Sequence, residues 1–135
     1  MHSFPSISVL AVLLAAFLSF AWGGLYWGVF SARISRVVGL DADTRSMPPA
    51  ALVVAFLTRI VQSFGIAATL AYAGVSSLGL GALGGAVIFC LLLLPLMLGQ
   101  AAFGPPFGSW PRLAVGTPEA LVGFAIMGAV GVLWR

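Results

Sequence analysis

The sequence from Leu80 to Ala102 reads LGALGGAVIFCLLLLPLMLGQAA and contains no charged residue. An α-helix rises 1.5 Å per residue, so about 20 apolar residues cross the ~30 Å hydrocarbon core of a bilayer. The strands of a transmembrane barrel would instead alternate apolar and polar positions, and this run is continuously apolar. The stretch therefore predicts a transmembrane helix, and we expect Pro95 to kink it.

The composition of the whole chain agrees with a lipid environment. Of its 135 residues, 61% are hydrophobic and 7% are charged, and the mean hydropathy is +1.16. A soluble domain carries roughly 25% charged residues, because its surface must be solvated. We predict an all-α membrane protein, a single domain over residues 1–135 that forms a four-transmembrane-helix bundle with short loops. Its spans are expected at about 7–30, 50–72, 80–102 and 118–134.

The connection after the first span is the most polar part of the chain. Ile34, Val37 and Val38 have i, i+3, i+4 spacing, which predicts a short amphipathic helix over residues 31–38 at the membrane interface. The aspartates Asp41 and Asp43 follow it, and two carboxylates without further oxygen ligands make a poor cation site. We therefore expect a solvated turn there.

The connection before the fourth span holds several prolines and glycines. Because of these breaks we expect residues 103–117 to be non-helical. Pro118 and Glu119 would then open the fourth helix, where a carboxylate favours the positive end of the helix dipole.

Arginines indicate how the chain is oriented. All six basic residues are arginines, and they are scattered along the chain, which argues against a nucleic-acid partner. Four lie in the first and third connections (Arg33, Arg36, Arg45 and Arg112), and only Arg135 lies on the other side. The positive-inside rule then places both termini on the periplasmic side of a bacterial inner membrane. We expect the first helix to stay uncleaved, and aromatic side chains to form interfacial belts at Trp22, Tyr26, Trp27, Trp110 and Trp134.

Arg59 is the most unusual residue, because it lies near the middle of the second predicted span. Gln62 and Ser63 share its helix face, so the three form a polar stripe. An arginine at this depth needs a partner, and we expect Glu119, Gln100 or backbone carbonyls near Pro95 to supply one. The stripe could bind an anion or line a substrate pathway, or Arg59 could hold helices together.

Small residues predict close contacts between helices. Gly24 and Gly28 form a GxxxG motif in the first span, Gly81 and Gly85 form another in the third, and Ala125 and Ala129 are an equivalent pair in the fourth. The contacts could lie within the bundle or between proteins. We expect Cys90, the single cysteine, to be a small buried hydrophobe.

The polar inventory is too small for the usual catalytic sites. One histidine and three acidic residues provide no catalytic constellation, no metal site and no cofactor site. We therefore expect a protein that is not an enzyme. It would be an accessory or structural protein that packs against a larger membrane complex or another copy of itself. The alternative is a small homo-oligomeric transporter or channel built around the Arg59 stripe.

The overall pattern resembles the bacterial membrane protein family called domain of unknown function 1761. A glycine and an aromatic pair end the first helix, a Gly-Leu and acidic turn follows, and a proline lies inside the third helix. The matching positions are Gly23, Tyr26, Trp27, Phe30, Gly39-Leu40-Asp41, Pro95, Phe103-Gly104, the segment Met127–Gly131, and Trp134. The resemblance implies a four-span architecture and adds no mechanism.

Overall fold

The computed structural model confirms the predicted fold class. It describes residues 5–38, 48–105 and 108–133, and these parts of the chain are helical with no strand. Four helical stretches are long and apolar enough to cross a membrane. The predicted turn at Asp41–Asp43 and the chain end at Trp134 and Arg135 lie outside the described residues.

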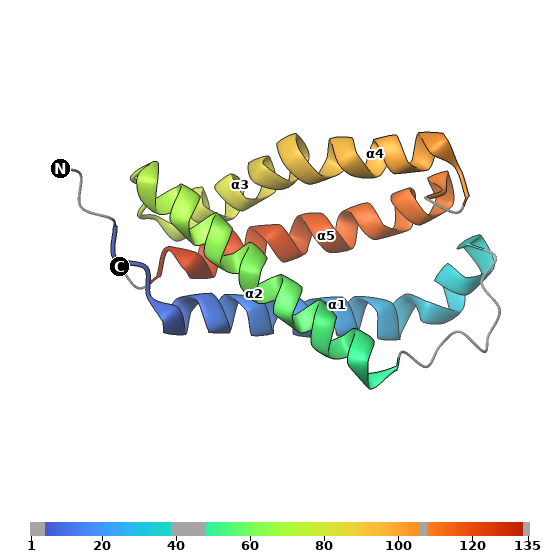
Figure 1. Cartoon of the computed structure of the whole chain (residues 1–135), viewed down its shortest axis with the longest axis horizontal. Helices are drawn as coiled ribbons and strands as arrows, with labels where there is room; N and C mark the ends of the chain where they lie inside the picture. Colours follow the sequence, from blue (N-terminus) through green and yellow to red (C-terminus); the bar gives the residue numbers. More distant parts are fainter. Residues whose placement is uncertain (1–4, 39–47, 106–107, 134–135) are drawn as a thin grey trace.

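Six helical segments make the four spans (Figure 1). The first two spans are α1 (Val9–Val38) and α2 (Pro49–Tyr72). The third comprises α3 (Leu78–Ile88), the short π-helix η2 (Phe89–Leu93) and α4 (Leu94–Phe103), and the fourth is α5 (Trp110–Gly131). The helix α5 lies between α1 and the α3–α4 span, while α2 crosses the bundle obliquely and packs against α1 and α5. The fourth helix is therefore the centre of the bundle.

The fourth helix is longer than the sequence indicates. It begins at Trp110 rather than at Pro118, because Ser109 caps it by accepting a hydrogen bond from the backbone N–H of Arg112 and Pro111 occupies its first turn. Serine at the cap and proline in the first turn start helices rather than break them. Pro118 and Glu119 consequently lie inside α5, and the expectation that residues 103–117 are non-helical is wrong for Phe103, which ends α4, and from Trp110 onward.

The first helix also differs from the expectation. It runs without a break from Val9 to Val38, so residues 31–38 are helical but do not form a separate interfacial helix. The part of α1 that is apolar enough to cross a membrane is Val9–Phe30. The two arginines that follow, Arg33 and Arg36, are exposed on the extension of the same helix.

The third span changes its hydrogen bonding just before Pro95. Proline lacks an N–H group, and its ring clashes with the carbonyl of the residue four positions earlier. Here the preceding turn is a π-helix, in which the N–H of Leu94 donates to the carbonyl of Phe89, five residues back. The span therefore accommodates Pro95 by a local change of helix type and continues as α4.

Glycines set the distance between α3 and α5. A Cβ added to Gly81 would lie 2.5 Å from the carbonyl oxygen of Gly128, and one added to Gly85 would collide with the carbonyl of Phe124. Of the two small residues predicted on α5, Ala125 lies at this contact, since its Cα would be 3.3 Å from a Cβ added to Gly85. The closest approach to Gly81 is made by Gly128, whereas the sequence predicts Ala129 at this place. The bundle does not use the other GxxxG motif in this way. A Cβ added to Gly24 or Gly28 would meet no atom within 4 Å.

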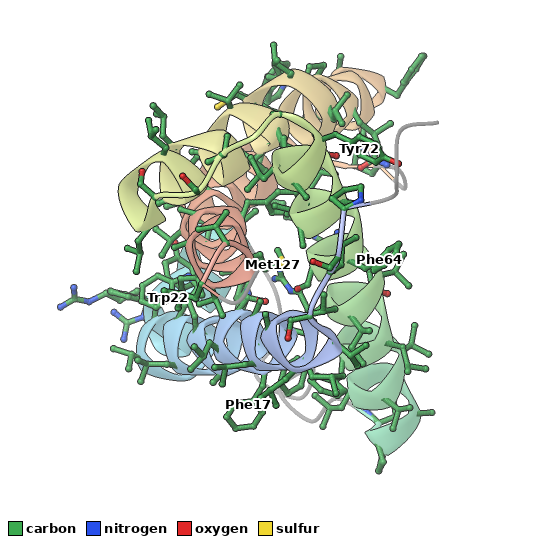
Figure 2. All side chains as sticks on the ribbon, turned by 90° about the vertical axis from the view of Figure 1, so that its left-hand side faces the viewer. Phe17, Trp22, Phe64, Tyr72 and Met127 are labelled. Atoms are coloured by element: carbon green, nitrogen blue, oxygen red, sulfur yellow. The ribbon has the colours of Figure 1, made fainter. Side chains whose placement is uncertain are left out.

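The interior of the bundle consists mainly of apolar side chains, many of them small, together with the buried polar residues Ser19, Ser63 and Glu119. The outside is covered by large apolar side chains. Figure 2 shows Met127 between the helices, whereas Phe17 and Phe64 point outward. Met127 and Phe89 are fully buried, and Phe17 and Phe64 are each more than half exposed. The expectation for Cys90 is wrong, because this side chain is exposed on the outer face of the π-helix. The exposed apolar surface is what a lipid environment requires.

Candidate functional site: an intramembrane ion pair beside an open groove

An ion pair links the second and fourth spans near their midpoints. The Nη2 of Arg59 in α2 donates a hydrogen bond to the Oε1 of Glu119 in α5 over 2.8 Å. The Arg59 side chain is 18% exposed and that of Glu119 is 9% exposed. Of the partners expected for Arg59, the structure thus supplies Glu119. Helix capping cannot explain Glu119, since it lies well inside α5.

Two glycines make room for this pair. A Cβ added to Gly23 of α1 would lie 2.9 Å from the Glu119 Oε1 and 3.9 Å from the Arg59 Nη2. A Cβ added to Gly123 of α5 would lie 3.2 Å from the Arg59 Nη1. Sequence reasoning missed both residues as part of the site. The sequence does indicate Gly123, because it follows Glu119 by four positions and therefore shares its helix face.

Two aromatic side chains of α1 bind the backbone of α5 around the ion pair. The indole N–H of Trp22 donates to the carbonyl of Glu119 over 3.1 Å, and the hydroxyl of Tyr26 donates to the carbonyl of Val115 over 2.7 Å. The donors are one turn apart on α1 and the acceptors are one turn apart on α5. Pro118 lies within this turn and lacks an N–H, so the carbonyl that loses its helical donor is that of Ala114, next to Val115. Trp22 and Tyr26 therefore join α1 to α5, and their place in an interfacial aromatic belt stays a prediction.

The remaining residues of the predicted polar site are distributed unevenly. Gln62 and Ser63 share the α2 face of Arg59, and in the described parts of the chain their Oε1 and Oγ atoms are buried without a hydrogen-bond partner. Gln100 is exposed on α4. It borders a separate pocket of about 170 Å³ together with Ser109 and Arg112, at the start of α5. The structure thus brings Arg59 and Glu119 together and leaves Gln100 elsewhere.

A groove of about 210 Å³ opens beside the ion pair, between α1 and α2. Several of its walls, including Gly24, Trp27, Leu52 and Ala55, are exposed, so the groove opens on the outside of the bundle. Its lining residues are Phe20, Gly23, Gly24, Trp27, Leu52, Ala55, Arg59 and Glu119. The groove is therefore apolar and partly aromatic, with one ion pair in its wall.

The described residues offer no set of side chains suited to bind a metal ion. Within residues 5–38, 48–105 and 108–133, no three His, Cys, Asp or Glu side chains are grouped so that they could hold a metal ion. The chemistry that the site offers is hydrogen bonding and charge in an apolar surrounding.

Fold and site together define a class: a small multi-pass membrane protein whose helices are joined by an intramembrane Arg–Glu pair. Comparison with known proteins gives the family. The family described as "Protein of unknown function (DUF1761)" matches residues 10–132, and the chain belongs to it. No curated protein and no solved structure matches the chain.

Proposed function

We propose that this chain is a structural or accessory membrane protein that packs against the transmembrane helices of a larger assembly. The observation that carries the proposal is the outward position of Gly24 in the apolar part of α1, where an added side chain would meet nothing within 4 Å. A glycine in a helix allows another backbone to approach closely. The bundle makes no such use of Gly24, so a helix of another protein is the partner that fits it.

The arrangement of polar groups supports this proposal over transport. Glu119 neutralises Arg59 within one chain, so the pair does not need a substrate to be compensated. A transport pathway would bring Arg59, Gln62 and Gln100 to one water-accessible cavity. The groove beside Arg59 is lined by neither glutamine. The homo-oligomeric transporter or channel remains the second candidate, and the polar stripe with the buried Gln62 and Ser63 atoms is the feature that favours it.

An enzymatic role has little support. The chain has three acidic residues and one histidine, and one of those acids is already engaged with Arg59. A nucleophile activated by a neighbouring base would need at least one further pair of such groups at one place. We therefore propose a function without catalysis.

We further propose that the chain lies in a bacterial inner membrane with both termini outside. The exposed arginines Arg33 and Arg36 follow the apolar part of α1, and Arg112 lies in the first turn of α5. These two helix ends lie at the same end of the bundle (Figure 1). The positive-inside rule assigns this end to the cytoplasm.

The test compares two glycine variants in the same tagged chain. Gly24→Leu fills the outward position on α1. Gly65→Leu is the matched control, because Gly65 is also exposed, inside α2, and would meet nothing within 4 Å. After extraction in a mild detergent, native mass spectrometry is expected to find a heteromeric complex for the wild type and Gly65→Leu but not for Gly24→Leu. A complex that both variants retain, or a purely monomeric wild type, would contradict the proposal, and a homo-oligomer would favour the transporter.

A further inference from the structure

The Arg59–Glu119 pair leaves hydrogen-bonding capacity at the wall of the groove. A guanidinium has five N–H donors, and within the described part of the chain the Arg59 side chain donates one hydrogen bond, to the Glu119 Oε1. The polar side-chain atoms that are buried without a partner in those residues belong to Gln62 and Ser63. The unused donors of Arg59 are therefore accessible rather than sealed, and Arg59 is among the residues that line the groove.

The depth of the site selects the kind of head group that can reach it. Arg59 and Glu119 lie near the midpoints of helices that cross the whole bilayer, so they are about 15 Å from either interface. A phosphate or carboxylate head group is held at the interface by its hydration, and moving it to this depth is costly. The pair is itself neutral overall, so it offers no net charge to compensate an ionic ligand. A neutral group that accepts hydrogen bonds avoids the large cost of moving a charge into the membrane and needs no opposite charge from the protein.

The size and walls of the groove favour a flat ring. A cavity of about 150 Å³ is enough to bind benzene, so the groove of about 210 Å³ has room for one substituted six-membered ring. Phe20 and Trp27 supply aromatic walls, and aromatic side chains pack well against flat rings. Because the groove opens outward, the tail of such a ligand would stay in the lipid.

We propose that this groove binds the ring of a neutral lipid that carries carbonyl acceptors, as a lipid quinone does. The guanidinium of Arg59 donates to a ring carbonyl while Glu119 keeps the site electrically neutral. The inference concerns a ligand site between α1 and α2, with Glu119 of α5 in its wall, and goes beyond the accessory function proposed above. Because Gly24 also lines the groove, the ring and a partner helix at Gly24 would compete for the same place.

Binding is tested on the purified chain alone, reconstituted in nanodiscs, so that the result does not depend on a protein partner. The probe is a decyl-substituted benzoquinone, and its saturable binding is measured above the partition into empty nanodiscs. Decylbenzene and decanoate serve as competitors with the same tail length. We expect saturable binding of about one quinone per chain, with no competition from either compound. Equal competition by decylbenzene would mean that the groove takes only apolar groups, and competition by decanoate would mean that it takes acids. Either result overturns the proposal.

Variants then locate the site. Ala55→Leu narrows the groove from an exposed position on α2, and Ala21→Leu makes the same change at an exposed position of α1 that does not line the groove. The double variant Arg59→Leu/Glu119→Leu removes the donors together with the counter-charge. We expect the double variant to weaken binding about tenfold or more, as loss of a hydrogen bond to a charged group does. Ala55→Leu should weaken binding by a similar factor because the larger side chain fills the groove, and Ala21→Leu should bind as the wild type. Thermal unfolding shows that each variant is folded. Undiminished binding by a folded Ala55→Leu or a folded double variant would refute the site.

Discussion

At the scale of single residues, the ion pair is the strongest constraint on the molecule. Replacing either Arg59 or Glu119 with leucine leaves the other charge buried without its partner, which costs about 3–5 kcal/mol in proteins where it has been measured. Replacing both removes the uncompensated charge, so Arg59→Leu/Glu119→Leu is expected to be much less destabilised than either single variant. The test is the free energy of unfolding in detergent, compared with the wild type for each single variant and for the double variant. Additive losses in the double variant would show that the two side chains do not act as a pair.

The neighbouring glycines of α1 give a second prediction, because only one of them faces the pair. A methyl group at Gly23 would press on the carboxylate of Glu119, which Arg59 holds in place. We expect Gly23→Ala to cost about 1–3 kcal/mol, as overpacking of an interior does. Gly24→Ala is the control, since its methyl group would meet nothing within 4 Å. We expect the free energy of unfolding of Gly24→Ala to equal that of the wild type. Equal losses of this free energy in both variants would contradict the role assigned to Gly23.

At the scale of helices, the contact between α3 and α5 depends on backbone atoms that cannot move aside. A methyl group at Gly85 would collide with the carbonyl of Phe124, so Gly85→Ala must push the two helices apart. We expect a loss of about 2 kcal/mol or more, within the range for overpacked interiors. Gly79→Ala, on the same helix, would meet nothing within 4 Å and should leave stability unchanged. Thermal unfolding of the two variants decides this, and a stable Gly85→Ala would mean that the helices are not in such close contact.

The sequence predicts the helices better than it predicts how they meet. Continuous apolar runs fix the number of spans, because a bilayer demands their length and hydrophobicity whatever their neighbours are. The partner of Arg59 could be narrowed to a few candidates from charge alone, and Glu119 is among them. The predicted start of α5 at Pro118 is wrong because Pro111 and Pro118 both suit a first helical turn, and it is the cap at Ser109 that places the start at Trp110. The roles of Gly23 and Gly123 depend on which helix lies opposite, which no local pattern contains.

At the scale of the whole molecule, the proposed orientation can be read by labelling. In a Cys90→Ser background, Ser76→Cys places a thiol in the α2–α3 connection, and Phe103→Cys places one at the end of α4, at the opposite end of the bundle. Both positions are exposed. With both termini outside, a membrane-impermeant maleimide added to intact spheroplasts should label Ser76→Cys, and Phe103→Cys only after lysis. The reverse pattern would invert the orientation.

The ion pair also has a consequence for how the protein is made. Arg59 and Glu119 are 60 positions apart in the chain, so α2 leaves the ribosome well before α5 does. Until then Arg59 has no counter-charge, and a charged residue at the centre of a helix opposes insertion by about 2.5–3.5 kcal/mol. We therefore expect the second helix to reach its final depth only when the fourth is inserted beside it. A chain truncated before α5 should leave α2 poorly inserted, and Arg59→Leu should restore its insertion.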